Sequence, residues 1–152
     1  MQAILEDYIS PDELKKFWQT YENERRKSKD GLVSPQTRFE YALALIRSRY
    51  PTDIHRGITE LEDLCSTGDP QARRDYLYYL ALANTKLKEY QRARDCIKKF
   101  LSVEPENRQA QELDKLIKDK LTKEGLLGMA MVGGAAVAIG GLIVAGISMA
   151  KK

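Results

Sequence analysis

The chain has 152 residues, which is enough for one compact domain, and charged side chains make up 31% of it. Its 25 basic and 22 acidic residues give a formal net charge of +3, and Lys151 and Lys152 supply two of these charges. The rest of the chain is therefore close to neutral, which excludes strong electrostatic binding to nucleic acid as its main function.

Residues 1–9, MQAILEDYI, form a short amphiphilic arm before the first helix signal. The arm is acidic and no Lys or Arg precedes Lys15, which excludes a secretory signal or an organelle presequence. Two interpretations stay open: the arm covers a binding groove of the domain that follows, or it is a frayed terminus. The apolar side chains that could cover a groove are Ala3, Ile4, Leu5, Tyr8 and Ile9.

Capping residues and helix breakers predict six helices in a domain over residues 10–124. The first begins with SPDE, in which Ser10 caps the helix, Pro11 occupies its first position and Glu13 completes a capping box. We expect helices from 10 into the polar stretch 23–31, from 34 to 50, from 52 or 53 to 67, from 69 to 87, from 89 to 102 and from 105 onward. No alternating strand pattern appears, so the predicted fold class is all-α.

The second to fifth helices repeat one pattern. The segment LALI at 43–46 aligns with LALA at 80–83, and the second unit is close to a tetratricopeptide repeat. The first unit has one extra residue in the turn at 50–53. Because two repeats rarely bury enough surface alone, the first and sixth helices should be caps, giving a six-helix bundle with two tetratricopeptide-like helix pairs plus capping helices. Small residues expected at close helix crossings are Ala44, Gly57, Ala81 and Ala93.

The second and fourth helices should line a concave groove for a peptide or a helix of a protein partner. The alternative is that one or both of its tyrosines pack beneath the capping helices. By the repeat alignment, the groove-facing residues are Arg38, Tyr41, Leu45 and Arg49 in the first unit and Asp75, Tyr78, Leu82, Thr85 and Lys86 in the second.

No pattern in the sequence indicates an enzyme. His55 is the only histidine and lies at a helix start, no glycine-rich phosphate loop is present, and acidic runs fit solvated helix faces. Cys65 and Cys96 lack metal-ligand spacing and fit small buried residues in a reducing compartment. We therefore expect neither a cofactor nor a metal.

Residues 125–150 are typical of a transmembrane tail anchor, followed by a basic tail at 151–152. Leu126–Ala150 carries no charge and would extend about 38 Å as a helix, compared with roughly 30 Å of hydrocarbon. Lysines flank both ends, and Lys151 and Lys152 form a short basic flank after a moderately apolar span. This combination favours the mitochondrial outer membrane or peroxisomes, with the N-terminal domain in the cytosol.

Small residues lie along one face of the expected anchor helix. A ridge of this kind lets two transmembrane helices pack closely, and self-association is one interpretation. The other is that Gly and Ala only moderate the hydrophobicity of the span. The ridge consists of Ala130, Gly134, Ala138, Gly141 and Ala145.

Four segments together resemble the mitochondrial fission 1 family. They are RFEYALALIRSRY, RRDYLYYLALANTKLKEYQRA, EPENRQAQELDKLI and KEGLLGMAMVGG, in this order. The resemblance implies a tail-anchored adaptor of the mitochondrial outer membrane, and also of peroxisomes, that promotes fission by recruiting a dynamin-related GTPase directly or through adaptor proteins.

The resemblance also implies a concave partner surface. Carried over by position, it consists of Tyr41, Leu45, Tyr78, Leu82, Thr85, Lys86 and Tyr90, with Tyr79 at its edge. The family often has an aromatic residue where this chain has Thr85, which leaves the breadth of the groove and the choice of partner open. The alternative function is a chaperone-docking or protein-import receptor on the same membrane, although apolar residues replace the Lys and Asn that such a clamp requires.

Overall fold

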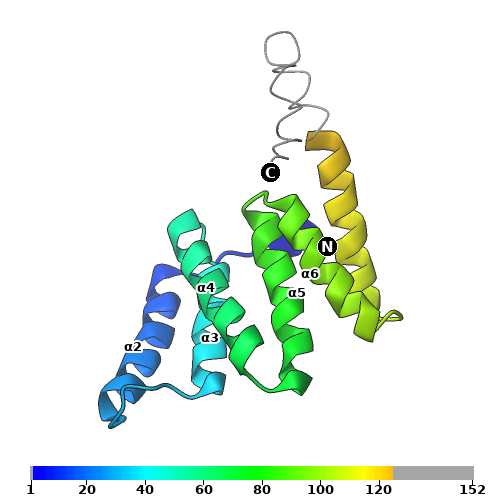
Figure 1. Ribbon diagram of the computed structural model, residues 1–152. Helices are drawn as coiled ribbons and strands as arrows, with labels where there is room; N and C mark the ends of the chain where they lie inside the picture. The colour runs from blue at the N-terminus through cyan, green and yellow to red at the C-terminus, as the bar shows by residue number, and fades with distance from the viewer. Residues whose placement is uncertain (1, 125–152) are drawn as a thin grey trace, which may run out of the picture. The chain divides into compact units, whose positions relative to one another are not determined.

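The computed structural model describes residues 2–124, and within them only helices, turns and loops occur (Figure 1). The labelled helices are α1 (Gln2–Leu5), α2 (Pro11–Lys27), α3 (Pro35–Ile46), α4 (Pro51–Thr67), α5 (Pro70–Lys86) and α6 (Tyr90–Val103), and a last helix covers 108–124. The six predicted helices and the all-α fold class are confirmed, and α1 is an additional short helix. The predicted transmembrane helix lies outside the described residues.

Short-range hydrogen bonds determine where several helices begin. Ser10 Oγ accepts a hydrogen bond from the Glu13 N–H at 3.1 Å, and a carboxylate oxygen of Asp69 accepts one from the Gln71 N–H at 3.0 Å. Ser34 caps α3 in the same way, because its Oγ accepts a hydrogen bond from the Thr37 N–H. A proline occupies the first turn of α2, α3 and α5. These predicted starts are confirmed because each cap bonds to its own helix.

The turn between α3 and α4 differs from the prediction. α3 ends at Ile46 rather than near 50, and Tyr50, not residue 52 or 53, occupies the N-cap position of α4. Asp53 does not cap the helix, because its carboxylate accepts a hydrogen bond from Ser48 Oγ at 2.7 Å. The Ser48 hydroxyl in turn accepts a hydrogen bond from the Tyr50 N–H at 3.1 Å. The extra residue of this turn thus allows Ser48 to connect the two helices.

The helices pack in two pairs, α3 with α4 and α5 with α6, while α4 also packs on α5 and α2 packs on α3. Gly57 allows the close crossing of the first pair. A Cβ atom at this position would lie 2.7 Å from Ile46 Cγ2 and 3.0 Å from the Ala42 carbonyl oxygen. Ala93 on α6 is fully buried, in line with the small residue expected there.

The central core joins α3, α4 and α5. Its buried members come mainly from the facing sides of these helices, and Phe39 and Tyr79 pack against it. The Phe39 ring contacts both Tyr76 and Tyr79 edge-on, with centroids 5.3 and 5.8 Å apart. The buried set is Ala42, Ile46, Ile54, Ile58, Leu61, Leu64, Tyr76, Leu80 and Ala83.

The first cap, α2, is only partly covered. None of its residues is fully buried, and Trp18, which belongs to its apolar face, remains 40% exposed. Tyr21 packs on Tyr41 of α3 with ring centroids 4.9 Å apart. One side of α2 therefore remains available along its boundary with α4.

The last helix begins at residue 108 rather than near 105. The side-chain oxygen of Asn107 accepts a hydrogen bond from the Ala110 N–H at 3.0 Å and acts as the cap. Ala110, Leu113 and Ile117 on one face of this helix are fully buried. Residues up to Ile117 form one compact unit, and the described residues 118–124 belong to a second unit.

Candidate partner-binding surface

The groove residues predicted on α3 pack beneath α2. Tyr41 and Leu45 are buried, and the Tyr41 hydroxyl accepts a hydrogen bond from Arg56 Nη2 at 3.3 Å. Burial raises the pKa of Tyr41, and the nearby Arg56 partly opposes this change. Arg38 pairs with two carboxylates of α4 and is thus part of the repeat scaffold. The packing of Tyr41 on Tyr21 corresponds to the alternative that a tyrosine packs beneath a cap.

The groove residues predicted on α5 are also mainly internal. Tyr78 is buried between the Tyr79 and Phe100 rings, with centroids 5.3 and 5.9 Å away. Leu82 and Thr85 are buried, and the Thr85 hydroxyl donates to the Ala81 carbonyl oxygen at 2.7 Å. The remaining predicted residues include Tyr90, which is buried at the start of α6, and Asp75, which is exposed.

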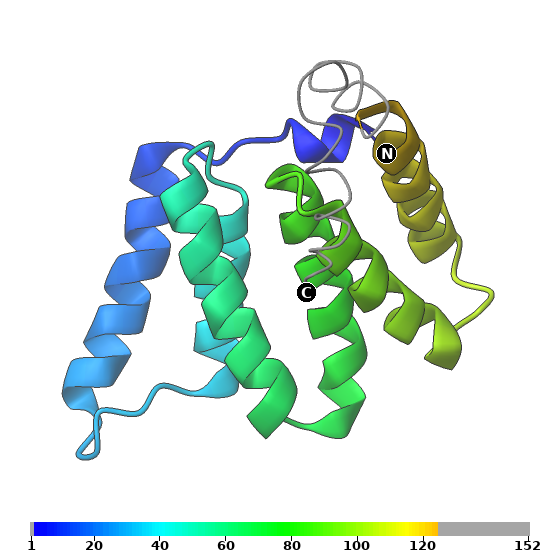
Figure 2. The same ribbon diagram turned by 45° about the horizontal axis from the view of Figure 1, so that its top comes forward.

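The N-terminal arm is docked on the domain. α1 packs against α5, and the segment between α1 and α2 passes across the helix ends (Figure 2). Leu5 and Ile9 are buried, and the Ile9 N–H donates a hydrogen bond to the Arg47 carbonyl oxygen at 3.0 Å. The described part of the arm therefore covers the C-terminal ends of α3 and α5; Met1 lies outside the described residues.

Two polar residues of the arm face three cations of the domain. Asp7 forms an ion pair with Arg47 at 3.6 Å. Arg49 Cζ and Lys86 Nζ lie 5.3 and 5.2 Å from the centroid of the Tyr8 ring, within the range of cation–π interactions. We call Arg47, Arg49 and Lys86 the cation cluster. It includes two residues that the sequence assigned to the groove, Arg49 and Lys86.

Lys86 also connects the two repeat units. Its Nζ donates a hydrogen bond to the Ile46 carbonyl oxygen at 2.5 Å, at the C-terminal end of α3, where backbone carbonyls lack helical partners. The pKa of Lys86 is lowered to about 8, mainly by burial and also by the nearby Arg47, while Asp7 opposes the change. The position of this ammonium group thus depends on both α3 and the arm.

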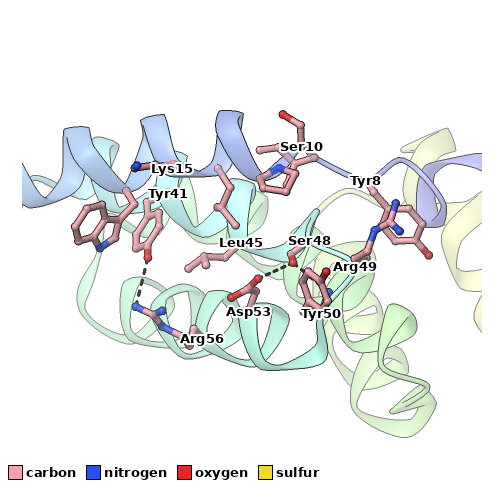
Figure 3. A pocket seen from close by; sticks show the side chains of 14 residues that line it. Tyr8, Ser10, Lys15, Tyr41, Leu45, Ser48, Arg49, Tyr50, Asp53 and Arg56 are labelled. Atoms are coloured by element: carbon pink, nitrogen blue, oxygen red, sulfur yellow. Dashed lines mark hydrogen bonds between the residues drawn. The ribbon is translucent and has the colours of Figure 1, made fainter.

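A cleft remains open between α2 and α4, with α3 behind it (Figure 3). We call it the α2–α4 cleft; its volume is about 730 Å³. Tyr41 and Leu45 form part of its floor, and Trp18 and Tyr50, which are 40% and 59% exposed, stand at its walls. Its further lining residues are Tyr8, Ile9, Ser10, Pro11, Leu14, Lys15, Ser48, Arg49, Asp53 and Arg56.

The polar rim of the α2–α4 cleft is mainly cationic. Lys15, Arg49 and Arg56 line it, and the single acid, Asp53, accepts the hydrogen bond from Ser48. Aromatic walls with a few charged groups suit an amphipathic helix or peptide better than a small metabolite. Among these polar groups, Asp53 accepts from Ser48 and Arg56 donates to Tyr41, so both are held within the domain.

The sequence did not reveal that Lys15, Trp18, Tyr50, Asp53 and Arg56 share one cleft. The available signal was the extra residue in the α3–α4 turn, which brings Tyr50 to the cleft and directs Asp53 toward Ser48. The eleven groove residues predicted from the sequence separate into several environments. Arg38 pairs with carboxylates of α4, and Asp75 is exposed. Tyr41, Leu45 and Arg49 line the α2–α4 cleft, Tyr78 and Tyr79 line a smaller hollow beside α6, Lys86 contacts the arm, and Leu82, Thr85 and Tyr90 are buried.

Within residues 2–124, no group of three His, Cys, Asp or Glu side chains could hold a metal ion. Cys65 and Cys96 are free thiols, and burial raises the pKa of both, to about 11 for Cys96. Neither is therefore an activated nucleophile.

No helix in the described part of the chain is long and apolar enough to cross a membrane. The predicted anchor at 125–150, its ridge and the basic flank of Lys151 and Lys152 lie outside those residues. The ridge consists of Ala130, Gly134, Ala138, Gly141 and Ala145.

Comparison with known proteins identifies the family. Residues 36–68 match the Fis1 N-terminal tetratricopeptide repeat, and residues 74–126 match the Fis1 C-terminal tetratricopeptide repeat. The mitochondrial fission 1 proteins of Rattus norvegicus and Homo sapiens are 44% and 43% identical to this chain over 117 residues, which cover 77% of this chain and 75% of each relative. The chain belongs to the mitochondrial fission 1 protein family.

Solved structures of mitochondrial fission 1 proteins have the same fold. Fis1 from Saccharomyces cerevisiae has a TM-score of 0.72 and 29% sequence identity, covering 81% of this chain and 92% of that chain. A second solved structure is yeast Fis1 in complex with an Mdv1 fragment that contains the N-terminal extension and coiled coil domains. It has a TM-score of 0.70 and 28% sequence identity, covering 78% of this chain and 90% of that chain. The tetratricopeptide-like fold and the family resemblance predicted from the sequence are confirmed.

Proposed function

We propose that this protein is a non-enzymatic adaptor, anchored by its C-terminal tail, that promotes fission of mitochondria and peroxisomes by recruiting a dynamin-related GTPase or its adaptor proteins. The observation that carries the proposal is the open α2–α4 cleft, whose exposed Trp18 and Tyr50 frame an apolar floor. Family membership supports the process, because the relatives are mitochondrial fission 1 proteins.

A helical segment is the partner that best fits this cleft. An amphipathic helix could place an apolar residue against Leu45 while acidic residues face Lys15 and Arg56. Yeast Fis1 binds an Mdv1 fragment that contains coiled coil domains, and this example supports the same class of partner here.

The docked arm provides a second, regulated surface. Because residues 2–9 cover the ends of α3 and α5, a partner that binds the predicted concave groove must displace them. The arm buries only Leu5 and Ile9 among its described residues, and its ion pair with Arg47 is exposed, so displacement costs far less than unfolding the domain. The arm would then limit access to the residues around Lys86.

The tail would position these surfaces at the organelle. We propose that residues 125–150 insert in the outer mitochondrial membrane, and also in the peroxisomal membrane, with residues 10–124 in the cytosol. The length and uncharged character of Leu126–Ala150 support this placement. Self-association through the small-residue ridge would raise the local density of the cytosolic surface.

The test is complementation in cells that lack their own mitochondrial fission 1 protein. The full chain should restore the normal mitochondrial network, and a chain without residues 126–152 should remain diffuse and inactive. If the full chain neither reaches mitochondria nor alters their network, the proposed function is wrong.

A paired variant tests the cleft. Trp18→Ala with Tyr50→Ala should preserve localisation but reduce recruitment of the dynamin-related GTPase at least fivefold, scored by co-localisation. Leu32→Ala is the matched control, because Leu32 is 69% exposed and lies in the loop between α2 and α3, outside the lining of the cleft. Full recruitment by the double variant would exclude the cleft as the binding surface.

A further inference from the structure

Cys65 and Cys96 come from different repeat units but contact the same core. Cys65 lies in the last turn of α4, next to the buried Leu64, and Cys96 lies in the middle of α6, next to the buried Ile97. Both cysteines are half-buried and pack against the central core cluster. Because α4 and α6 both pack on α5, the two thiols lie at the edges of helix faces that meet at this helix.

The charges around the two thiols indicate that they are neighbours. Burial is the main cause that raises the pKa of both thiols, and Glu62 of α4 and Lys99 of α6 also act on both. Each cysteine therefore lies near a charged side chain of the other helix. The charge of the Cys65 thiolate also contributes to the pKa of Cys96, which is raised to about 11.

Cys65 occupies a part of α4 that can move. The last carbonyl groups of a helix lack helical partners, and the Cys65 carbonyl oxygen instead accepts a hydrogen bond from the exposed Arg73, with Nε at 3.0 Å. Helix ends open at a lower free-energy cost than helix interiors. The last turn of α4 can therefore adjust until the Cα atoms are about 4.4–6.8 Å apart, which is the separation that a disulfide requires.

We propose that Cys65 and Cys96 form a reversible dithiol site that a peroxide oxidises to an intramolecular disulfide. The bond joins α4 of the first repeat unit directly to α6 of the second, two helices that otherwise connect through α5. Both thiols are free in this structure, which is the reduced state of the pair. A disulfide of this kind is reversible by thiol exchange and changes the rigidity of the two repeats.

The oxidation uses one hydrogen peroxide molecule for two thiols. The Cys65 thiolate attacks one peroxide oxygen, the O–O bond breaks, and a sulfenic acid forms while the second oxygen leaves as hydroxide and takes up a proton. The Cys96 thiol then loses its proton and attacks the Cys65 sulfur, the S–O bond breaks, and the released hydroxide takes up this proton. Two thiols are thereby oxidised to one disulfide, and the peroxide is reduced to two water molecules.

Cys65 reacts first because Arg73 and Lys99 counteract the effect of burial on its pKa. Burial still keeps the thiolate fraction of both cysteines small, so the oxidation should be slow.

The experiment exposes the full chain, in detergent micelles and without denaturant, to hydrogen peroxide. Free thiols are then alkylated, and the chain is digested with trypsin without reduction. Mass spectrometry should detect residues 57–73 linked to residues 95–98, because these tryptic peptides contain Cys65 and Cys96. Dithiothreitol should release both peptides. Free thiols or sulfinic acids in both peptides, without the link, would overturn the inference.

Cys65→Ala with Ser66→Cys is the matched control. It moves the thiol by one residue, about 100° around α4, to an exposed position. The link to Cys96 should form at least tenfold less than in the unmodified chain. Equal linkage would show that the packing of α4 and α6 on α5 does not select the bond, and it would overturn the inference.

Two further measurements characterise the bond. In a mixture of isotopically labelled and unlabelled chains, linked peptides should come from one chain only, and statistical mixing would overturn the inference. The oxidised chain should unfold at a higher urea concentration than the reduced chain, because the bond closes the loop between Cys65 and Cys96, and dithiothreitol should remove this gain. A lower midpoint after oxidation would show that the bond requires a distorted fold and would also overturn the inference.

Discussion

The ammonium group of Lys86 lies 2.5 Å from the backbone carbonyl oxygen of Ile46 and joins the end of α5 to the end of α3. α3 has no basic residue in its own last turn, so a cation from the other repeat unit interacts with its negative end. The same ammonium group faces Tyr8 of the arm. One side chain therefore connects the two repeats and the arm.

Lys86→Met should destabilise the domain. The methionine keeps most of the apolar stem but leaves the Ile46 carbonyl without its hydrogen bond, so the free energy of unfolding should fall by about 1 kcal/mol. Urea unfolding at pH 10.5 measures the change, because at lower pH the cost of burying the charged ammonium, which lowers its pKa, opposes the loss of the hydrogen bond. Lys98→Met on the exposed side of α6 is the control and should change stability by less than about 0.5 kcal/mol.

The stability of the domain should also depend on Lys86 through pH. Its pKa is lowered from 10.5 in the unfolded chain to about 8 in the folded protein. Between these values the unfolded chain binds more protons, so the contribution of Lys86 to the free energy of unfolding rises with pH. Urea titrations between pH 8 and 10.5 should show that Lys86→Met lacks this rise and Lys98→Met keeps it. Equal slopes in both variants would contradict the assignment.

Gly57→Ala should be strongly destabilising. The added Cβ would lie 2.7 Å from Ile46 Cγ2 and 3.0 Å from the Ala42 carbonyl oxygen, so α3 and α4 must separate. A loss of about 2 kcal/mol is expected from overpacking of this kind. Gly31→Ala provides a comparison, because Gly31 has a φ of 73° with open space around it, and strain alone should cost about 1 kcal/mol. Chemical denaturation measures both losses of free energy of unfolding, and a smaller loss for Gly57→Ala than for Gly31→Ala would contradict the prediction.

Lys88→Gly should stabilise the domain by about 0.5–1 kcal/mol. Lys88 has a φ of 63° in the turn after α5, and the Glu89 N–H donates to the Asn84 carbonyl oxygen at 2.8 Å, as in a helix end that favours glycine. A higher midpoint in thermal unfolding is the expected result. A lower midpoint would show that the lysine side chain contributes more than its backbone conformation costs.

Deletion of residues 2–9 should increase partner binding at the groove. The arm covers the ends of α3 and α5, and under the proposed function its removal should raise the amount of dynamin-related GTPase that co-purifies with the full-length chain. The increase should be several-fold at equal protein levels. Unchanged or weaker co-purification would show that the arm does not compete.

Local signals predicted the starts of α2, α3 and α5 correctly because the relevant contacts are close in sequence. Ser10 bonds to a backbone N–H three residues away, and Asp69 bonds to one two residues away. The end of α3 was predicted four residues too late, because Ser48 turns the chain through hydrogen bonds that involve Tyr50 and Asp53. Helix propensities describe single residues, so they cannot predict such a contact.

The groove was harder to predict because a helix position does not reveal which neighbour covers it. The repeat alignment placed Tyr41 and Tyr78 at equivalent positions, and both are buried. Tyr41 lies against Tyr21 of α2, while Tyr78 lies against Phe100 of α6. Equivalent positions of the two repeats thus have different neighbours, because the capping helix α2 covers the first position and the repeat helix α6 covers the second.

The sequence by itself determined the all-α class, the two repeats, the family and most helix starts, because periodicity and capping act over a few residues. It also placed a small residue, Gly57, where α3 and α4 cross. Only the tertiary structure decided that the arm docks on the cation cluster and that an open cleft remains between α2 and α4. These features depend on residues far apart in the chain, such as Tyr8 and Lys86, whose contact exists only after the helices have packed.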